Sequence, residues 1–247
     1  MAQSVMENVK HEPLLNGNDF KISVSKNHTF GTDAVLLYNF SNARGDDLAV
    51  DLGTGCGIIA LLMLRDQKCQ KVYGVDISDE AINLCLDTKE RLNLEKFEPI
   101  LSNLTELKGK IPFGNASLVV CNPPYKAKGA GIKSTNPREL VARHETECEL
   151  SDIVEAAAKL LNTGGRFCVC QRPERTAELL CLMSEAKLEP KRIRFVAKRP
   201  ESEPWLVLIE GKKGAKRGNR VEPTLFTTNE DGSFSNEMLK IYGKYKP

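Results

Sequence analysis

Long hydrophobic runs are absent from this sequence of 247 residues. The longest apolar run, residues 58–64, is far shorter than the about 20 residues that a membrane-spanning helix needs. The first 15 residues contain charges and no apolar segment, so the sequence predicts no secretory signal. We therefore expect a soluble, cytoplasmic protein that acts without a membrane.

Metal-binding and disulfide patterns are also missing. The eight cysteines include no C-x-x-C pair, and most of them stand inside apolar segments, where reduced thiols pack as small hydrophobic groups. The three histidines are far apart in the sequence and form no zinc pattern. We expect reduced, buried thiols and no metal ion.

A strong net charge is absent too, since the formal net charge is only +2. The charge is nevertheless uneven, because residues 187–220 contain eleven Lys and Arg against four Glu. Such an excess fits contacts with a phosphate backbone, and it fits a solvated basic face without a partner equally well. The length and a hydrophobic content of 41% suit one α/β domain with additions.

A strand, a glycine turn and a helix start follow one another at residues 48–60. Gly53, Gly55 and Gly57 stand at alternate positions, which allows a sharp turn and a close approach of a ligand to the backbone. Asp51 ends the strand, where it orients the turn or reaches an amino group of the ligand. The spacing G-x-G-x-G differs from the G-x-G-x-x-G of dinucleotide-binding proteins. The alternative is a tight turn with a structural role only.

The next predicted strand, residues 71–78, carries a second acid near its end. Asp76, followed by Ile77, comes 19 residues after Gly57, where a carboxylate accepts hydrogen bonds from both ribose hydroxyls of a nucleoside ligand. The alternative role of Asp76 is beside the cap of the predicted helix at 80–93, although Ser78 or Asp79 can already cap it. After a third strand, residues 98–102, Asn103 is expected at the edge of an adenine ring.

Residues 119–125 carry the most specific signal. A buried strand stops at Asn122-Pro123-Pro124-Tyr125, because proline cannot donate a hydrogen bond to the sheet. The side-chain oxygen of Asn122 and the carbonyl oxygen of Pro123 can both accept hydrogen bonds from one exocyclic amine, while Tyr125 stacks on the ring that carries it. This positions the lone pair of the amine toward an electrophile. The alternative is a turn that only ends the strand.

The segments around this core complete an α/β pattern. A strand at 20–24 and a helix opened by Gly31-Thr32-Asp33 precede it. The polar loop at 126–149 contains Arg138, Arg143 and His144 and is expected to order on substrate. A helix at 150–161, a loop at 162–165 and a strand at 166–171 follow.

The last third of the chain predicts a helix and two strands. The helix, residues 173–186, is expected to bury Ala177, Leu180, Cys181 and Ser184. Residues 192–197 and 205–210 are joined by a connection too short for a crossover helix, so we expect an antiparallel hairpin at the sheet edge. The tail, residues 221–247, is expected to lie over the surface.

Taken together, the glycine turn, the ribose acid and the Asn-Pro-Pro-Tyr strand end resemble the Rossmann-like, S-adenosylmethionine-dependent amino-methyltransferases over about residues 27–210. The resemblance implies a seven-stranded sheet with helices on both faces and an antiparallel last strand. It also implies a division into a preamble of strand hairpin and helix (1–47), a methyltransferase domain (48–213) and a tail (214–247). This family often has Asp at the adenine edge, where this chain has Asn103.

A closer resemblance comes from three stretches, residues 27–37, 142–145 and 171–175, together with residues 188–192 and the basic hairpin. These are similar to the bacterial tRNA adenine-N6 methyltransferases that act beside the anticodon of a valine tRNA. The resemblance implies transfer of a methyl group from S-adenosylmethionine to adenine N6 in a single-stranded or flipped position. It implies a tRNA partner, and we expect a monomer.

Site residues carry over by position. The residues that hold the amine are Asn122, Pro123, Pro124 and Tyr125. The residues that bind the cofactor are Phe30, Gly31, Thr32, Asp33, Asp51, Gly53, Gly55, Gly57, Asp76, Ile77 and Asn103. The residues that contact RNA are Arg138, Arg143, His144, Lys198, Arg199, Lys212, Lys213, Lys216 and Arg217.

Several other functions share some of these features. An enzyme of the same fold could methylate a protein glutamine, since that amide also offers an NH2 group, but such enzymes typically carry an additional N-terminal helical domain. Methylation of adenine in DNA or ribosomal RNA is a further alternative, although a DNA adenine methylase usually needs a recognition domain. A non-catalytic RNA-binding protein with this fold and a dinucleotide oxidoreductase are alternatives of another class.

Overall fold

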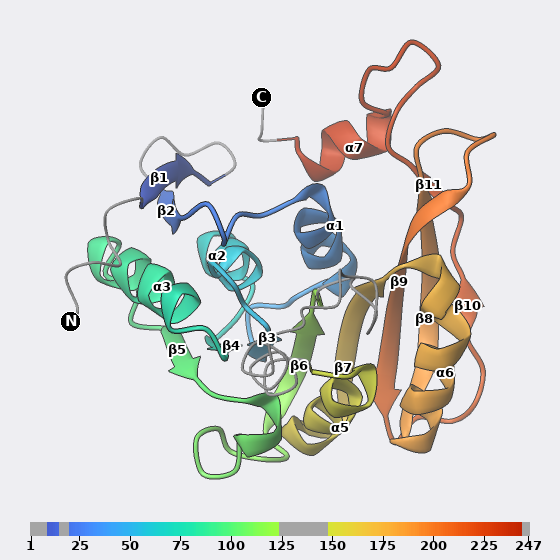
Figure 1. Ribbon diagram of the computed structural model, residues 1–247. Helices are drawn as coiled ribbons and strands as arrows, with labels where there is room; N and C mark the ends of the chain where they lie inside the picture. Colours follow the sequence, from blue (N-terminus) through green and yellow to red (C-terminus); the bar gives the residue numbers. More distant parts are fainter. Residues whose placement is uncertain (1–8, 15–19, 124–147, 244–247) are drawn as a thin grey trace, which may run out of the picture.

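Figure 1 shows the computed structural model, which describes residues 9–14, 20–123 and 148–243. Within these residues, a nine-stranded sheet forms the centre of the molecule. A separate antiparallel hairpin of β1 (Lys10–Pro13) and β2 (Lys21–Val24) packs through β2 on α3 (Asp79–Arg91). None of the helices in the described part of the chain is long and apolar enough to cross a lipid bilayer.

The strands of the sheet follow the order β10-β8-β9-β7-β6-β3-β4-β5, and β11 pairs with β8 as well. Their bounds are β3 (Leu48–Leu52), β4 (Lys71–Asp76), β5 (Phe97–Leu101), β6 (Ala116–Cys121), β7 (Leu161–Gln171), β8 (Leu188–Ala197), β9 (Pro204–Lys213), β10 (Arg220–Val221) and β11 (Leu225–Phe226). The expected seven-stranded sheet corresponds to β3–β9. In it, β9 is antiparallel to both β7 and β8 and the remaining pairs are parallel, which confirms the predicted fold class.

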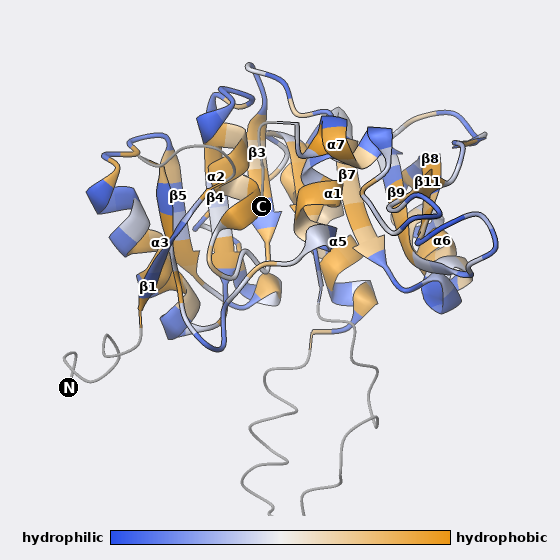
Figure 2. Cartoon of the chain, turned by 90° about the horizontal axis from the view of Figure 1, so that it is seen from above, coloured by the Kyte–Doolittle hydropathy of each residue, from blue (hydrophilic) through white to orange (hydrophobic). Residues whose placement is uncertain are grey.

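Helices cover both faces of the sheet (Figure 1). One face packs against α1 (Thr32–Ser41), α2 (Ile58–Arg65), α3 and α7 (Asn236–Ile241), and the other against α5 (Leu150–Leu160) and α6 (Thr176–Glu185). Because successive strand side chains point to opposite faces, Val119 and Cys121 belong to the core under α5 and Val120 to the core under α1. Central strands covered on both faces are rich in hydrophobic residues, and Figure 2 shows hydrophobic segments in the strands of the sheet and in the helices that cover it.

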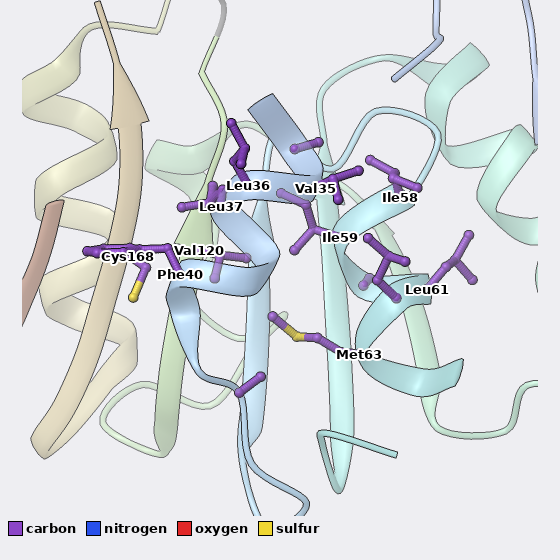
Figure 3. Packing of buried hydrophobic residues seen from close by; sticks show 14 of the residues in the cluster. Val35, Leu36, Leu37, Phe40, Ile58, Ile59, Leu61, Met63, Val120 and Cys168 are labelled. Carbon is purple, nitrogen blue, oxygen red and sulfur yellow. The ribbon is translucent and has the colours of Figure 1, made fainter. Parts of the chain in front are cut away.

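The core between the sheet and the first two helices is closely packed (Figure 3). Leu36, Leu37 and Phe40 of α1 lie with Val120 and Cys168 of the sheet, while side chains of α2 such as Leu61 and Met63 fill the neighbouring space. This packing holds α1 and α2, and therefore the segments that precede both helices, against the carboxyl ends of the strands.

Two expectations about the predicted helix at 173–186 are wrong. The predicted inward face of the helix fails because the residues that α6 buries fully are Leu179 and Met183, whereas Ala177, Cys181 and Ser184 are exposed and Leu180 is half-buried. The helix also starts later than predicted, since residues Pro173–Arg175 form the 3-10 turn η2.

The start of β7 differs from prediction as well. The strand begins at Leu161 and takes in the four residues expected as a loop, with Gly164 at a φ of 83° and a register irregularity against β6. A strand can absorb such a stretch where a glycine lets the backbone kink.

The tail was expected to lie over the surface, but it also adds strands to the sheet and side chains to the core. β10 and β11 extend the sheet by pairing in parallel with β8, so β8 is not the free edge that the hairpin prediction implied. Leu225 of β11 and Met238 of α7 belong to the same core as α1, and Tyr242 stacks on Phe234 at 5.7 Å.

A network of buried polar groups joins the amino ends of the strands. Asp47 accepts hydrogen bonds from Ser117 Oγ at 2.7 Å and from the Arg166 guanidinium at 2.8 Å. Glu210 accepts from Arg192 Nη1 at 2.9 Å, and Arg166 also bonds the carbonyl oxygen of Ser41. The amino edge of the sheet is therefore closed by mutually satisfied charges.

The place of the tail in the core leads to a first prediction. Met238→Ala should lower the free energy of unfolding by about 2–5 kcal/mol, because it opens a cavity at a fully buried position. The matched control is the next residue, Leu239→Ala, which is 52% exposed and should change stability by about 0.5 kcal/mol or less. Urea denaturation of both variants measures the difference, and equal stabilities would contradict a structural role for α7.

Candidate active site

A cavity of about 1310 Å³ opens at the carboxyl edge of the sheet. Its walls come from the ends of β3, β4, β6 and β7, from the segment before α1, and from the start of α5. Open α/β sheets bind their ligands outside the carboxyl ends of the strands, so this position alone favours a ligand site.

The glycine turn forms one wall of the cavity. The N–H groups of Gly53 and Thr54 both donate to the carbonyl oxygen of Val75, at 2.8 and 2.9 Å, which fixes the turn to the end of β4. Gly53 and Gly55 have φ values of 70° and 56°, and a Cβ atom added at either would meet nothing within 4 Å. The turn therefore presents bare backbone to open space, which suits a closely approaching ligand.

Gly57 has a different role from the other two glycines. It is not among the residues that line the cavity, and a Cβ atom there would lie 3.1 Å from Cys85 Sγ and 3.3 Å from Phe97 Cζ. With a φ of 85°, it serves as the cap of α2 and as a packing position. The prediction that Gly57 binds a ligand directly gains no support from this geometry.

Asp51 orients the turn through a hydrogen bond. Its carboxylate accepts a hydrogen bond from Thr54 Oγ1 at 2.7 Å and one from the backbone of Ala60 in α2, and the residue is 1% exposed. Burial raises the pKa of Asp51 from 3.8 to about 7, against the effect of these hydrogen bonds. Of the two predicted roles, the structure shows the one in which Asp51 holds the loop.

Asp76 stands opposite the glycine turn at the end of β4. Its Oδ2 accepts from the N–H of Gly55 and its Oδ1 from the N–H of Ser78, both at 2.9 Å. Each carboxylate oxygen has two acceptor positions, so both oxygens keep the capacity to accept a ligand hydroxyl. Ile77 is 43% exposed and lines the cavity, which supplies an apolar surface beside the acid. Ser78 also caps α3, as predicted.

Asn103 lines the same wall, with its side chain already engaged. Its Oδ1 accepts hydrogen bonds from the backbone N–H and the hydroxyl of Thr105, both at 3.0 Å, and thereby caps the 3-10 turn η1 (Leu104–Glu106). A ligand at this position would therefore meet the amide nitrogen of Asn103 more readily than its oxygen.

The segment before α1 and the start of that helix also line the cavity. Phe30, Gly31 and Asp33 line the cavity, whereas Thr32 is not among its lining residues. The sequence analysis missed His28, which also lines the cavity and whose Nε2 lies 3.2 Å from Ser78 Oγ. This contact joins the preamble to the start of α3, and an isolated histidine gave no signal for it.

Asn122 and Pro123 line the cavity at the end of β6, where the sequence predicted them. Asn122 Oδ1 accepts a hydrogen bond from the thiol of Cys170, at 3.0 Å, on the neighbouring strand β7. The other predicted residues Pro124, Tyr125, Arg138, Arg143 and His144 lie outside the described residues. The strand order β7-β6-β3-β4 thus brings Asn122, the glycine turn and Asp76 to one edge.

A further part of the cavity extends from Asn122 toward α5 and α6. Leu150 and Ile153 of α5, Gln171 at the end of β7, and Arg175 and Glu178 near the start of α6 line it. None of these was predicted as a site residue, although residues 171–175 belong to the stretches that carry the family resemblance. Among the described residues, no group of His, Cys, Asp and Glu side chains could hold a metal ion.

The predicted RNA-binding cations are divided between two edges of the sheet. Lys198 and Arg199 follow β8 at the carboxyl edge, while Lys212, near the end of β9, pairs with Glu189 at the start of β8 and thus lies at the amino edge. About eight strand residues at about 3.3 Å each, roughly 25 Å, separate the two groups. Lys213, Lys216 and Arg217 continue from Lys212, and the ammonium group of Lys213 is bonded to the carbonyl oxygens of Ala158 and Leu161.

The cysteines match expectation in part. All eight are free, and six are buried, but Cys148 and Cys181 are exposed. Burial raises the pKa of the Cys121 thiol well above its ordinary value. Cys121 is therefore a neutral core group beside the site.

Comparisons with known proteins agree with this geometry. A family model described as "Methyltransferase small domain" matches residues 25–188. A "tRNA1(Val) (adenine(37)-N6)-methyltransferase" of Parabacteroides distasonis is 31% identical over 183 residues, which cover 73% of this chain and 75% of the relative. A protein of the same description from Aeromonas salmonicida is 24% identical and covers 85% of this chain and 87% of the relative.

A solved structure supports the fold. The crystal structure of a protein described as a predicted O-methyltransferase from Agrobacterium tumefaciens superposes with a TM-score of 0.68 at 18% identity, covering 86% of this chain and 96% of the other. At this identity, the likeness shows the fold alone.

The buried acid leads to a prediction about pH. Because the folded state holds the proton on Asp51 more tightly than the unfolded chain does, the stability from Asp51 is fully present below about pH 4 and is lost as the pH rises through about 7. The free energy of unfolding of the wild type minus that of Asp51→Asn should therefore fall by roughly 2–4 kcal/mol from pH 4 to pH 8. Denaturant unfolding across this range measures it, and a difference independent of pH would contradict the raised pKa.

Proposed function

The chain belongs to the methyltransferase small domain family, and from this premise we propose that it methylates the N6 amine of an adenine in tRNA, with S-adenosylmethionine as the methyl donor. The observation that carries the proposal is the position of Asn122. Its carboxamide stands in the same cavity as the glycine turn and Asp76, where an amine bound to it would face a ligand held by the turn.

The walls fit a nucleoside cofactor. Gly53 and Gly55 leave room for its atoms, the two oxygens of Asp76 can accept from its ribose hydroxyls, and Ile77 offers an apolar surface to its base. Phe30, Gly31 and Asp33 are placed to contact its methionine end, and Asn103 its adenine edge. When bound, S-adenosylmethionine supplies an activated methyl group on a sulfonium.

Asn122 would position the adenine amine and interact with it electrostatically. Its Oδ1, together with the carbonyl oxygen of Pro123, would accept hydrogen bonds from the adenine amine, whose lone pair is otherwise delocalised into the ring. The thiol of Cys170 already holds Oδ1 in place, so the acceptor is oriented before the substrate arrives. Stacking of the adenine on Tyr125, with a supporting role for Pro124, completes the proposal.

The RNA would approach the carboxyl edge. Lys198 and Arg199 are exposed at this edge and carry the contacts to phosphates near the target, with Arg138, Arg143 and His144 from the preceding loop. The cations at the amino edge, Lys212, Lys213, Lys216 and Arg217, reach the tRNA only where it extends past the site. A cytoplasmic monomer that works without a metal ion is part of the same proposal.

Transfer of a radiolabelled methyl group into bulk tRNA, DNA and protein tests the substrate class directly. Label in N6-methyladenine of tRNA supports the proposal. Label found only in DNA adenine or in protein glutamine would replace it by one of the alternatives.

The role of Asn122 can be tested by substitution. Asn122→Ala should lower kcat by about 100-fold or more, because the amine loses its oriented acceptor, while the Kd for S-adenosylmethionine changes little. Asn115→Ala is the matched control, since this exposed asparagine precedes the other end of the same strand. Methyl-transfer kinetics and calorimetry measure both effects, and wild-type turnover by Asn122→Ala would reject the role.

The division of the cations gives a test with an internal control. The pair Lys198→Glu and Arg199→Glu should weaken binding of an anticodon stem-loop at least tenfold and lower the slope of log K against log salt by about 1–2. The pair Lys212→Glu and Lys216→Glu changes the same charge at the amino edge and should leave stem-loop binding nearly unchanged. Filter binding at several salt concentrations measures both, and equal losses would contradict binding at the carboxyl edge.

A further inference from the structure

A buried carboxamide without a complete set of partners lies beside Asn122. Gln171 is fully buried, and its Nε2 is the buried side-chain nitrogen or oxygen atom that lacks a hydrogen-bond partner in the described part of the chain. Native proteins rarely leave such a donor unsatisfied, because its desolvation is not compensated. An unsatisfied donor in the wall of a ligand cavity indicates that the ligand supplies the acceptor.

The hydrogen bond of the side-chain oxygen fixes the orientation of the Gln171 amide. Gln171 Oε1 accepts a hydrogen bond from the backbone N–H of Arg172, at 2.8 Å. The oxygen is thereby committed, so the group that remains is a donor with two hydrogens. The ligand atom that it fits is an acceptor.

The fold places this donor next to the acceptor of the proposed reaction. β6 and β7 are parallel neighbours, with Cys121 opposite Val169, and the thiol of Cys170 reaches Asn122 Oδ1. Gln171 is the next residue of β7, at the same edge, and adjacent strands are about 4.8 Å apart. Both side chains line the same cavity, so a flat group held by Asn122 would occupy the space that Gln171 borders.

The surroundings favour a neutral ring over a phosphate in this part of the cavity. Its apolar walls are Leu150, Ile153 and Leu182. Among the described residues, the charged groups near it are the carboxylates of Glu149, Asp152 and Glu178 against the guanidinium of Arg175, which is itself bonded to Glu178 at 2.7 and 2.8 Å. An excess of carboxylates disfavours an anion and leaves a nucleobase as the better fit.

On the basis of the proposed function, we propose that Gln171 Nε2 donates a hydrogen bond to the ring nitrogen of the target adenine that neighbours N6. The acceptors of Asn122 and Pro123 recognise an NH2 group, which guanine and cytosine also carry. Adenine has an acceptor nitrogen on either side of this amine, N1 on one edge and N7 on the other, whereas the NH2 of guanine is flanked on one side by an N–H donor. The adjacent donor thus disfavours guanine where it would meet the N1–H group, whereas cytosine, whose amine is also flanked by a ring acceptor (N3), is disfavoured only if the donor faces the N7 side.

Atomic substitution in the RNA tests this assignment. Wild-type enzyme and Gln171→Leu would each be assayed on three stem-loops that carry adenosine, 1-deazaadenosine or 7-deazaadenosine at the target position. We expect one deaza substrate to lower kcat/KM of the wild type at least tenfold more than it lowers kcat/KM of Gln171→Leu, because the variant has no donor to lose. Comparing the two enzymes removes the intrinsic change in reactivity of the analogue.

Two controls separate recognition from a structural role. Gln171→Leu should keep its melting temperature within a few degrees and its Kd for S-adenosylmethionine within about threefold. Gln70→Leu, a change of the same type at an exposed position, should show the wild-type pattern with all three RNAs.

The remaining outcomes would overturn either the role of Gln171 in base recognition or the proposed function. Equal penalties in wild type and Gln171→Leu, or a loss of cofactor affinity in the variant, would overturn the role in base recognition. If Gln171→Leu does not fold, Gln171→Glu, which replaces the donor by an acceptor of similar shape, takes its place in the comparison, and penalties equal to those of the wild type would overturn the role. No transfer to the adenosine stem-loop by the wild type would instead reject the proposed function, and the inference with it.

Discussion

The hydrogen bonds between the glycine turn and the end of β4 are the constraint on which the site depends. One carbonyl oxygen, that of Val75, accepts from both Gly53 and Thr54, and the Asp76 carboxylate accepts from Gly55. The turn can follow this path only because its glycines adopt positive φ values. The same bonds that shape the turn also orient the carboxylate of Asp76, so the wall and the acceptor are built together.

A buried acid beneath this turn is hydrogen-bonded to the turn itself. Asp51 is held by Thr54 and Ala60 in a position closed to water, and its raised pKa shows that burial outweighs these hydrogen bonds. The site therefore contains two acids with different environments. Both line the cavity, but Asp51 is almost fully buried and supports the turn, whereas Asp76 is half-exposed. Position within the sheet, rather than residue type, separates support from ligand binding.

Motifs with a backbone mechanism could be predicted from the sequence, and packing could not. Gly53, Asp76 and Asn122 were predicted at one site because parallel strands end at one edge. The buried face of α6 was predicted wrongly. Leu179 and Met183 recur at helical spacing, as Ala177 and Leu180 do, so periodicity alone did not show which pair is buried. The tail strands were missed because β10 and β11 contain two residues each. The separation of Lys198 from Lys212 follows from the antiparallel hairpin, whose ends lie at opposite edges.

The two edges of the sheet differ in how far the hydrogen-bonding capacity of their polar groups is satisfied. At the amino edge, Asp47, Arg166 and Glu210 are buried and bonded to one another or to neighbouring groups, so the charges there are compensated. At the carboxyl edge, Asp76 keeps acceptor capacity and Gln171 keeps a donor. Unsatisfied polar capacity costs stability, so a fold retains it where a ligand satisfies it. This difference, independent of any motif, favours the carboxyl edge as the place where a ligand binds.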